Sequence, residues 1–540
     1  MANSKRPNFL IIVANDLGFS DIAPYGGEIN TPVLERMATE GIRMTNFHTA
    51  SACSPTRSML FFGTDNHIAG LEYACYWRVL QGKTWLEGYL NWRVAALSEI
   101  LQDNGYHTII SGKWHLGLTK ELAPCSRGFD KNFSFLPGSG NHYAYEPQLD
   151  DGEFKIPCLN TDGYWMEGKN FVNHRTDLSE DFYSTTSFTD RMVQFLDETN
   201  ESEREKPFFA YLPFTALHWP LPAPREIVQK YARRYNTSPD DLTRRRLERL
   251  IQLGLVKEGV EPASPDMTEE DRKISAKKMD VFAAMVELID QNIGRVINHL
   301  KTTGELDNTF VLFMSDNGAE GAALEALPVI SISRLLLFLF KWLTQKYYNK
   351  SYENIGEKSS FFRYGARWAC AATSPSRGLK CWVTEGGIRC PCLIRYPTFQ
   401  AQESAITHRF TTVMDILPTI LDLAQVDHPG TSFRGRTIVM PCGKSWVQHL
   451  SSPDYYSAPS STVHGEDVHV HGWELFGQRA IREGKYKAVW IGNPRGKDDW
   501  ELHDLSEIET EVVKRLVDHW EKYYAETGMT QTPVFVVTKA

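Results

Sequence analysis

Short, mainly apolar runs recur along this chain and are separated by longer stretches of mixed composition. Strands that are buried on both faces of a parallel sheet have continuous apolar sequences rather than alternating ones. We therefore predict buried parallel strands at five of these runs. They are Phe9–Ala14, Thr108–Ser111, Phe208–Leu212, Phe310–Met314 and Cys392–Tyr396.

Helical periods lie between the predicted strands. The clearest has apolar residues at the i, i+3, i+4, i+7 spacing of one helix face. Its members are Phe282, Met285, Val286, Ile289, Ile293, Val296, Ile297 and Leu300. Strands that alternate with helices indicate an α/β fold. We expect a large, mainly parallel or mixed central sheet that is flanked by helices on both faces.

The pattern changes after about Pro429, where the apolar runs are shorter and turns are more frequent. A hairpin-like segment covers Gly477–Trp490, and Asp498–His519 looks like an acidic turn that leads into a helix. We therefore expect a main domain over residues 1–429. Residues 430–540 would form a smaller α+β subdomain packed on it.

Three unusual segments have ordinary interpretations. Arg244–Arg249 follows two aspartates and contains Glu248, so it is typical of an exposed helix face rather than a nucleic-acid patch. Glu198–Lys206 is typical of a solvated loop. Ala326–Leu343 is largely apolar, but its uninterrupted run, Leu335–Phe340, is far shorter than the roughly 20 residues of a membrane span. A buried or partner-facing amphipathic helix is the better interpretation there, and we expect no membrane contact.

Composition and charge restrict the partners. The chain has 540 residues and a formal net charge of −9, so it has no basic footprint for nucleic acid. An anionic substrate would therefore need a local cluster of cations. The N-terminus runs directly into Phe9–Val13 with no secretory signal pattern, and the nine cysteines show no repeated spacing. Both features favour the cytoplasm.

Polar residues follow the predicted strands, at the edge where open α/β sheets bind ligands. They are Asn15 and Asp16, Lys113 and His115, His218, and Asp316 and Asn317. Taken singly, each has an ordinary structural interpretation, such as a turn residue or a packed histidine. As a group they share one sheet edge. Short oxygen-bearing side chains in glycine-containing turns suit a hard cation, so Asp16, Asp316 and Asn317 predict a site for Ca²⁺ or Mg²⁺.

A second feature is the stretch Cys53-Ser54-Pro55-Thr56-Arg57, which precedes a predicted helix over Ser58–Phe62 that ends at Gly63. A cysteine at a helix N-terminus beside an arginine is expected to have a lowered pKa and to be reactive. The alternative is a buried structural cysteine in a turn.

This stretch resembles the signature in which sulfatases convert a cysteine to formylglycine. Other segments resemble the same family in order along the chain. They are Asn15-Asp16-Leu17-Gly18, Gly112-Lys113-Trp114-His115-Leu116-Gly117, His218-Trp219-Pro220, Ser315-Asp316-Asn317-Gly318, Lys380 with Thr384–Arg389, and Trp500–Leu505. The chain is thus identified as similar to the formylglycine-dependent sulfatases of the alkaline-phosphatase-like superfamily. It most resembles the cytoplasmic bacterial-type arylsulfatases.

The resemblance implies a role for each residue. Hydrated formylglycine made from Cys53 would attack the sulfur of an aryl or alkyl sulfate monoester, with Arg57 steadying it. Asp16, Asp316, Asn317 and residue 53 would hold one Ca²⁺ ion, with Mg²⁺ as the second choice. Lys113 and Lys380 would bind the sulfate oxygens, His115 would accept the proton of the nucleophile, and His218 would contact the substrate and protonate the leaving oxygen. The implied partners are a small-molecule sulfate ester and a formylglycine-generating maturation enzyme. The sequence predicts no oligomeric state.

Two positions depart from the family pattern. Asn15 stands where the family usually has aspartate; its amide oxygen can still be a metal ligand, but it should bind more weakly. Phe61-Phe62 stands where Leu-Thr is common. Two alternatives stay open: a phosphonate monoester or phosphodiester hydrolase of the same superfamily, which would share the fold and the metal, and a degenerate, non-catalytic sulfatase, which Asn15 suggests. Aromatic residues in probable loops could line the substrate pocket or simply pack, namely Tyr76, Trp77, Tyr143 and Tyr145.

Overall fold

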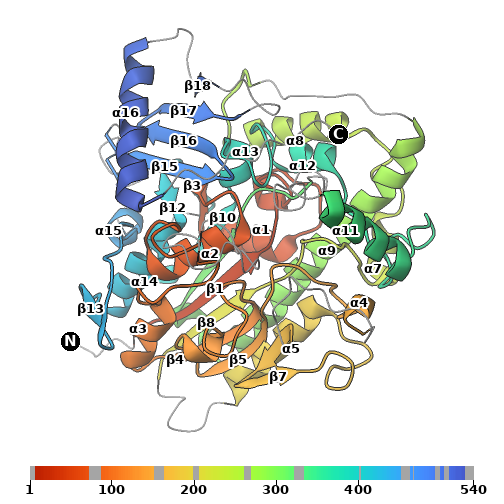
Figure 1. Cartoon of the computed structure of the whole chain (residues 1–540), viewed down its shortest axis with the longest axis horizontal. Coiled ribbons are helices and arrows are strands. Elements are labelled where there is room, and N and C mark those ends of the chain that lie inside the picture. Colours follow the sequence, from red (N-terminus) through yellow and green to blue (C-terminus); the bar gives the residue numbers. More distant parts are fainter. Residues whose placement is uncertain are drawn as a thin grey trace.

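A mixed sheet of ten strands forms the centre of the molecule in the computed structural model (Figure 1). Its strand order is β11-β2-β10-β9-β1-β8-β4-β5-β6-β7, and a separate four-stranded sheet has the order β15-β16-β17-β18. The structure describes residues 6–71, 87–150, 163–198, 206–260, 269–321, 334–399, 403–451, 462–465, 468–492, 499–503 and 510–529. The predicted class, a large central sheet flanked by helices with a smaller C-terminal α+β unit, is confirmed.

The strands and helices have the following bounds. The strands of the large sheet are β1 Asn8–Ala14, β2 Ile42–Met44, β4 His107–Lys113, β5 Lys131–Phe135, β6 Trp165–Glu167, β7 Asn170–Val172, β8 Phe208–Pro213, β9 Thr309–Ser315, β10 Cys392–Arg395 and β11 Ala405–Thr407. Two short pairs are β3 Phe47–His48 with β12 Thr411–Thr412, and β13 Ser432–Phe433 with β14 Arg436–Thr437. The helices are α1 Pro32–Thr39, α2 Cys53–Phe62, α3 Leu97–Asp103, α4 Pro147–Asp150, α5 Ser184–Asp197, α7 Arg225–Tyr231, α8 Pro239–Gln252, α9 Glu269–Thr302, α11 Arg334–Tyr347, α12 Ala366–Ala372, α13 Glu385–Ile388, α14 Ile416–Ala424, α15 Val447–Leu450 and α16 Thr510–Thr527.

Helices cover both faces of the large sheet, and β1 shows how the sequence divides between them. Successive side chains of a strand point to opposite faces. Leu10, Ile12 and Ala14 join the core that includes α1, α5, α9 and α12. Phe9, Ile11 and Val13 join the core that includes α2, α3 and α14. All seven residues of β1 are buried, which explains why the strand reads as a continuous apolar run.

The strands β9, β1, β8 and β4 are parallel, as predicted, and β5, which the sequence analysis did not identify, continues the parallel order. The prediction for Cys392–Tyr396 was wrong in direction: β10 runs antiparallel to both β9 and β2. An apolar run indicates burial on both faces, but it carries no information on strand direction. The predicted helix over residues 282–300 is confirmed as part of α9, and its apolar face packs in the core.

The four strands β15 Val470–Leu475, β16 Gln478–Glu483, β17 Tyr486–Trp490 and β18 Trp500–His503 form the antiparallel C-terminal sheet. One face packs on α16 (Figure 1), and the other contacts Val383, Ile388 of α13 and Phe410. The predicted hairpin is confirmed as β16 and β17. The predicted acidic turn was wrong at residues 500–503, which form a strand. The domain boundary at 429 and 430 stays a prediction.

Buried ion pairs tie the C-terminal sheet to the loop that follows α2. His67 Nδ1 lies 2.8 Å from Asp65 Oδ1, and its Nε2 lies 3.0 Å from Glu474 Oε2 in β15. Burial alone would lower the pKa of His67, but the two carboxylates outweigh it and raise the pKa to about 10. Tyr523 of α16 donates a hydrogen bond to Asp65 Oδ2 at 2.7 Å. The imidazolium therefore joins both parts of the molecule at neutral pH.

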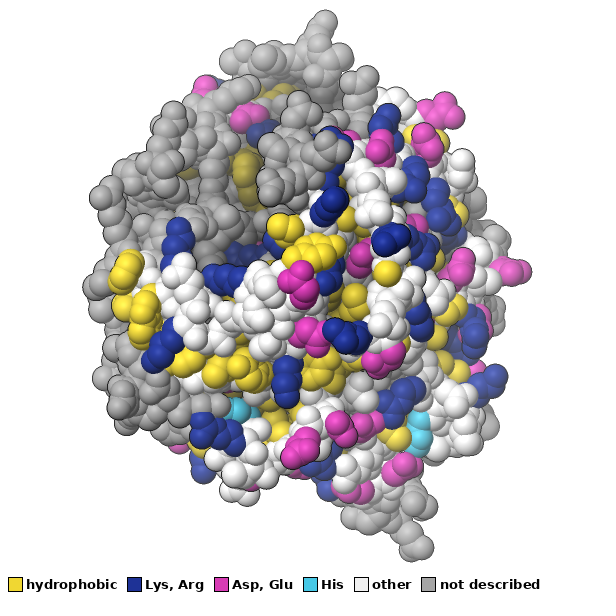
Figure 2. Space-filling view, turned by 90° about the vertical axis from the view of Figure 1, so that its right-hand side faces the viewer, with side chains coloured by type: hydrophobic (Ala, Val, Ile, Leu, Met, Phe, Trp, Pro, Cys, Tyr) yellow, Lys and Arg dark blue, Asp and Glu magenta, His cyan; other side chains and the backbone are white. Residues whose placement is uncertain are grey.

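The arginine-rich segment is only partly exposed, so that prediction was wrong in one respect. Arg244 and Arg245 face solvent, but Arg246 is 1% exposed and pairs with Asp21 at 2.7 Å and with Glu28 at 2.8 Å. The charge pattern could not show this, because the carboxylates come from a distant part of the chain. Lys, Arg, Asp and Glu side chains are interspersed on the described part of the face in Figure 2, which gives no single-sign patch there.

Two further predictions concern segments that are only partly described. Residues 199–205 of the predicted solvated loop lie outside the described residues. In the apolar segment, residues 334–347 form α11, on which Phe338 is 65% and Trp342 38% exposed. None of the helices within the described ranges is long and apolar enough to span a membrane.

Candidate active site

The strand ends bring the predicted residues together. Ala14 at the end of β1 lies opposite Ser315 at the end of β9, in parallel register. Asp16 and Asp316 therefore leave the sheet at the same level, and the backbone N–H of Asp16 donates to Asp316 Oδ1 at 3.1 Å. Strand β8 adjoins β1 on its other side, and β4 follows. This order places His218, Lys113 and His115 along the same edge.

An oxygen-rich group lies between β1 and β9. Atoms of Asp16, Cys53 and Asp316 that could be metal ligands lie within 4.8 Å of one another, and all three residues are buried. Asn317 Nδ2 donates to Asp16 Oδ1 at 2.8 Å. The Oδ1 atom of Asn317 is buried and has no hydrogen-bond partner within the described part of the chain. A buried carbonyl oxygen without a donor fits a hard cation, so the residues present suit a metal ion.

Cys53 and Arg57 enter this group from α2. The helix begins at Cys53, five residues earlier than predicted, and ends as predicted at Gly63, which has the left-handed φ of 62°. Residues four apart share a helix face. Cys53 Sγ lies 3.7 Å from Asp16 Oδ1, and the Arg57 guanidinium donates to Asp316 Oδ2 from Nε at 3.1 Å and from Nη2 at 2.7 Å.

The thiol of Cys53 is less acidic than the sequence suggested. Burial raises its pKa to about 11, although the ammonium groups of Lys113 and Lys380 act in the opposite direction. The expected lowering was wrong because Cys53 is only 3% exposed. Desolvation of the thiolate outweighs the helix terminus and the neighbouring cations. An unmodified Cys53 is therefore a poor nucleophile at neutral pH.

Two buried lysines place local positive charge beside these carboxylates. Lys113, the last residue of β4, is 0% exposed, and its Nζ donates to Asn15 Oδ1 at 3.0 Å. Lys380 is 5% exposed, and its Nζ donates to Asp16 Oδ2 at 2.9 Å. Asn15 thus lies beside the group of potential metal ligands that Asp16 belongs to. Its amide oxygen accepts from Lys113, and its Nδ2 donates to Thr215 O at 3.2 Å.

Two imidazoles face the same region. His218 Nδ1 lies 2.9 Å from the carbonyl oxygen of Trp219, so this nitrogen carries the proton and Nε2 is directed to the site, 3.9 Å from Asp16 Oδ2. A side chain at Gly138 would collide with His115 Nε2, at 2.4 Å from the Cβ position. Burial and the cations Lys113 and Arg57 hold the pKa of His115 well below its usual value, and burial with Lys380 and Lys113 does the same for His218. Both rings are therefore neutral.

The structure adds residues that the sequence did not single out. Glu320 is 5% exposed, and its Oε2 lies 3.2 Å from Lys380 Nζ. Trp219 lies beside His218, with ring centroids 4.9 Å apart, and it contacts Phe361 at 5.7 Å. An acidic residue three positions after Asn317 was the only signal for Glu320. Of the predicted aromatic residues, Tyr143 packs on Tyr183 and Tyr145 on Tyr348, whereas Tyr76 and Trp77 lie outside the described residues.

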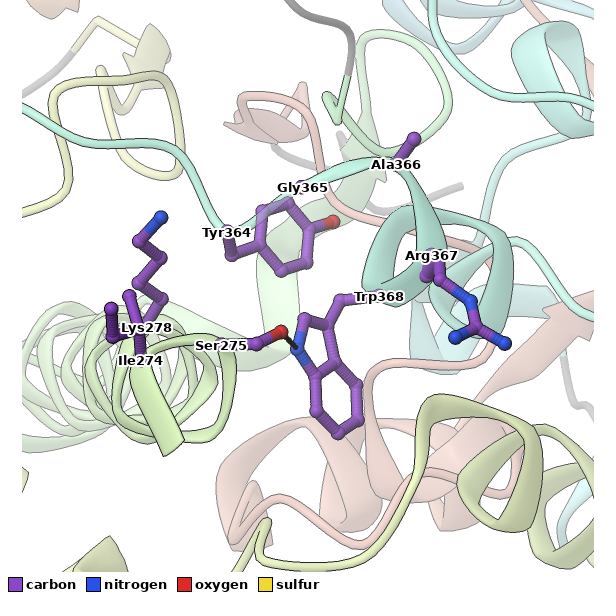
Figure 3. Close-up of a pocket in the computed structure, with 8 residues that line it drawn as sticks. All are labelled: Ile274, Ser275, Lys278, Tyr364, Gly365, Ala366, Arg367 and Trp368. Atoms are coloured by element: carbon purple, nitrogen blue, oxygen red, sulfur yellow. Dashed lines mark hydrogen bonds between the residues drawn. The ribbon is translucent and has the colours of Figure 1, made fainter. Parts of the chain in front are cut away.

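A surface pocket lies elsewhere, between the N-terminal part of α9 and the start of α12 (Figure 3). The Trp368 indole forms one wall and donates to Ser275 Oγ at 2.7 Å, while the Tyr364 ring faces it across the pocket. None of the predicted catalytic or metal-binding residues is among the residues that line it. They are Ile274, Ser275, Lys278, Tyr364, Gly365, Ala366, Arg367 and Trp368. The candidate active site is therefore the cluster at the strand ends.

Comparison with known families matches the sulfatase family model to residues 7–426, which include every residue of this cluster. The chain belongs to the sulfatase family. An arylsulfatase of Klebsiella aerogenes is 33% identical over 84% of this chain and 94% of its own length. An uncharacterized sulfatase of Schizosaccharomyces pombe is 50% identical over 98% of this chain and 96% of its own. This sulfatase is thus a sulfuric ester hydrolase.

The fold agrees with this assignment. The crystal structure of Ps i-CgsB in complex with k-i-k-neocarrahexaose has a TM-score of 0.63 and is 20% identical. The match covers 97% of this sulfatase and 93% of that chain. At this level of identity the likeness concerns the fold alone.

Proposed function

We propose that this sulfatase hydrolyses aryl sulfate monoesters with a formylglycine nucleophile made from Cys53. One observation carries the proposal: Cys53 is the first residue of a helix and points into a buried group of carboxylates and lysines, 3.7 Å from Asp16 Oδ1. A thiol with a raised pKa suits this position poorly, whereas a hydrated aldehyde offers two hydroxyls on one carbon. A formylglycine-generating maturation enzyme, active in the cytoplasm, would supply the modification.

We further propose that one Ca²⁺ ion binds to Asp16, Asp316, Asn317 and residue 53, with Asn15 as an additional, weaker ligand. When bound, the ion would make a hydroxyl of the hydrate easier to deprotonate and would offset the charge of the sulfate. Arg57 fixes the orientation of Asp316 through its two hydrogen bonds. The ligand oxygens are supplied by side chains, as Ca²⁺ prefers, and Mg²⁺ is the second choice.

The other residues bind the anion and move protons. Lys113 and Lys380 bind the sulfate oxygens, since both ammonium groups are buried at the strand ends. A neutral His115 accepts the proton of the attacking hydroxyl, and the new S–O bond forms as the bond from sulfur to the leaving oxygen breaks. His218 gives a proton to that leaving oxygen from Nε2; the negative charge of the bound ester favours its protonation. The second hydroxyl then loses its proton, sulfate leaves with the bonding electron pair, and the aldehyde reforms.

The wall beside His218 favours an aromatic leaving group. Trp219 contacts His218, Phe361 and, at 6.4 Å, Phe340 of α11. The Arg363 guanidinium lies 4.1 Å from the centroid of the Trp219 ring. Aromatic surfaces of this kind bind flat, apolar alcohols by offset or edge contacts. An aryl sulfate placed with its sulfur near residue 53 would extend toward this wall.

Two measurements test the proposed function. Mass spectrometry of the peptide that carries residue 53 should show a loss of about 18 Da, because CH₂SH becomes CHO. The purified protein should hydrolyse an aryl sulfate faster than an aryl phosphate diester. Active protein with a wholly unmodified thiol would contradict the mechanism. A strong preference for the diester would instead favour a phosphonate monoester or phosphodiester hydrolase, and a modified protein without any hydrolytic activity would favour a degenerate sulfatase.

Asn15→Asp is expected to strengthen Ca²⁺ binding about tenfold, since it adds a carboxylate beside Asp16 where an amide now stands. Isothermal titration calorimetry of Ca²⁺-depleted protein measures the change. Asn30→Asp, which places the same charge at the surface, is the matched control and should leave the affinity nearly unchanged. Equal affinities of the wild type and Asn15→Asp would show that position 15 does not act on the metal.

A further inference from the structure

Glu320 is a buried carboxylate at the active site to which the mechanism above gives no role. Its Oε2 lies 3.2 Å from Lys380 Nζ, and the two residues are each 5% exposed. The same ammonium lies 2.8 Å from Asp16 Oδ1 and 2.9 Å from Asp16 Oδ2. Lys380 is therefore held between two carboxylates, and one of them, Asp16, is also a potential metal ligand.

The backbone fixes Glu320 in this place. Lys380 N–H donates to Ala319 O at 3.0 Å, and Gly318 N–H donates to Gly387 O at 3.0 Å. The glycines on either side have no room for a side chain. A Cβ on Gly318 would lie 1.8 Å from Gly386 O, and one on Gly321 would lie 2.5 Å from Ala369 Cβ. Close packing on both sides makes this loop a rigid support for the contact between Glu320 and Lys380.

The carboxylate of Asp16 has several candidate partners, and two of them are cations. It accepts from Asn317 Nδ2 and from Lys380 Nζ, and it belongs to the group that could hold a metal ion. A divalent ion on Asp16 would repel an ammonium on the same oxygens, because two cations would then lie within a few ångströms in a buried site. Among the residues that the structure describes, Glu320 would then be the one carboxylate left as a partner of Lys380.

A second observation concerns the position of this ammonium. Atoms of Asp16, His218 and Glu320 that could be metal ligands lie within 4.8 Å of one another, and all three residues are buried. The ammonium of Lys380 already contacts two of these three residues. It therefore supplies a positive charge at a place where the side chains could otherwise receive a second ion.

We propose that Glu320 is a positioning residue that holds the Lys380 ammonium beside the sulfate position while the metal ion occupies Asp16. The Lys380 ammonium then acts as a fixed positive charge beside the metal ion and the sulfate position. This inference rests on the proposed function. Without Glu320, Asp16 would be the one carboxylate within the described part of the chain that the ammonium contacts. The ammonium would then compete with Ca²⁺ for Asp16 and turn away from the anion.

Glu320→Gln tests this role by binding as well as by rate. Calorimetry should show that the Kd values for Ca²⁺ and for inorganic sulfate each rise about tenfold, a change of about 1.4 kcal/mol in binding free energy. For an aryl sulfate, KM should rise and kcat should fall. Glu320→Asp, which keeps the charge, should recover part of the Ca²⁺ affinity. Unchanged Kd values in Glu320→Gln would overturn the inference.

The matched control is Glu287→Gln on α9. Glu287 is also buried and accepts from a lysine, Lys230, at 2.7 Å, but it is no part of the strand-end cluster. This variant should bind Ca²⁺ and sulfate as the wild type does. A tenfold loss in Glu287→Gln as well would show that any loss of a buried carboxylate weakens the site, and it would overturn a specific role for Glu320.

A double-mutant cycle separates positioning from simple charge. If Glu320 acts through Lys380, Glu320→Gln should not change the Ca²⁺ affinity of a Lys380→Met protein. A persistent tenfold loss would show that Glu320 attracts Ca²⁺ by its own charge, which would overturn the proposal. The binding experiments need no turnover. If Glu320→Gln weakens Ca²⁺ binding as expected but the wild type leaves aryl sulfates intact, only the proposed function is refuted. If the wild type hydrolyses aryl sulfates but Glu320→Gln binds Ca²⁺ normally, only this inference is refuted.

Discussion

Replacing Cys53 by alanine is expected to abolish aryl sulfate hydrolysis while the protein stays folded. The rate should fall by at least about 10⁴-fold, because no other group in the cluster can form the bond to sulfur. The structural effect should be small, at most about 1.5 kcal/mol, since the side chain at position 53 is short and the contact of the unmodified thiol with Asp16 Oδ1 is long, at 3.7 Å. Initial rates and urea unfolding of the same preparation measure both quantities.

Two companion variants make the Cys53 result specific. Cys390→Ala removes another buried thiol, one that contacts Thr49 rather than the carboxylates, and it should keep most of the activity. Cys53→Ser supplies one hydroxyl where the hydrated aldehyde supplies two, so a single turnover should leave the sulfate bound covalently to the protein. Steady multiple turnover by Cys53→Ser or Cys53→Ala would contradict the proposed nucleophile.

Replacing Arg57 by methionine is expected to destabilise the protein by about 3 kcal/mol and to lower the rate at least about 10³-fold. Arg57 is 1% exposed and gives two hydrogen bonds to Asp316, which is itself fully buried. Removing the guanidinium leaves this carboxylate without its cation. A bound Ca²⁺ ion can replace part of that charge, so the loss of stability should be larger in EDTA than with excess Ca²⁺.

Unfolding in urea, with and without Ca²⁺, measures this difference. The matched control is Arg127→Met, because Arg127 is equally buried and pairs with Glu99 at 3.3 Å outside the site. Both variants should be destabilised, but Ca²⁺ should restore stability only to Arg57→Met. Equal recovery by the two variants, or by neither, would argue against Asp316 as a metal ligand.

Much of this site could be predicted because strand ends are visible in the sequence. The apolar runs locate β1, β4, β8 and β9, and the parallel register then brings the residues that follow them to one edge. Asp16, Lys113, His218 and Asp316 were found in this way, from local patterns alone. The resemblance to sulfatases added the roles, above all for Cys53 and Lys380.

What the sequence could not predict depends on contacts between distant segments. The raised pKa of Cys53 comes from burial that is complete only in the folded chain. Arg246 looked exposed because Asp21 and Glu28, its partners, lie more than 200 residues earlier. Glu320 is an ordinary loop residue until residue 380 folds against it. The direction of β10 likewise depends on its neighbours rather than on its own residues.

The burial of Cys53 in the folded protein also limits the time in which the residue could be modified. Its partners Asp316 and Lys380 come late in the chain, and the indole of Trp473 donates to Thr49 O, just before the signature. At about 5–20 residues per second, synthesis of the 420 residues from Cys53 to Trp473 takes roughly 20–80 s. If a maturation enzyme modifies Cys53, as proposed, it would meet the cysteine in an unfinished, open chain during that interval. In the folded protein Cys53 is only 3% exposed. A molecule that folds before modification would then keep its thiol, and the active fraction of a preparation would depend on how fast modification is relative to folding.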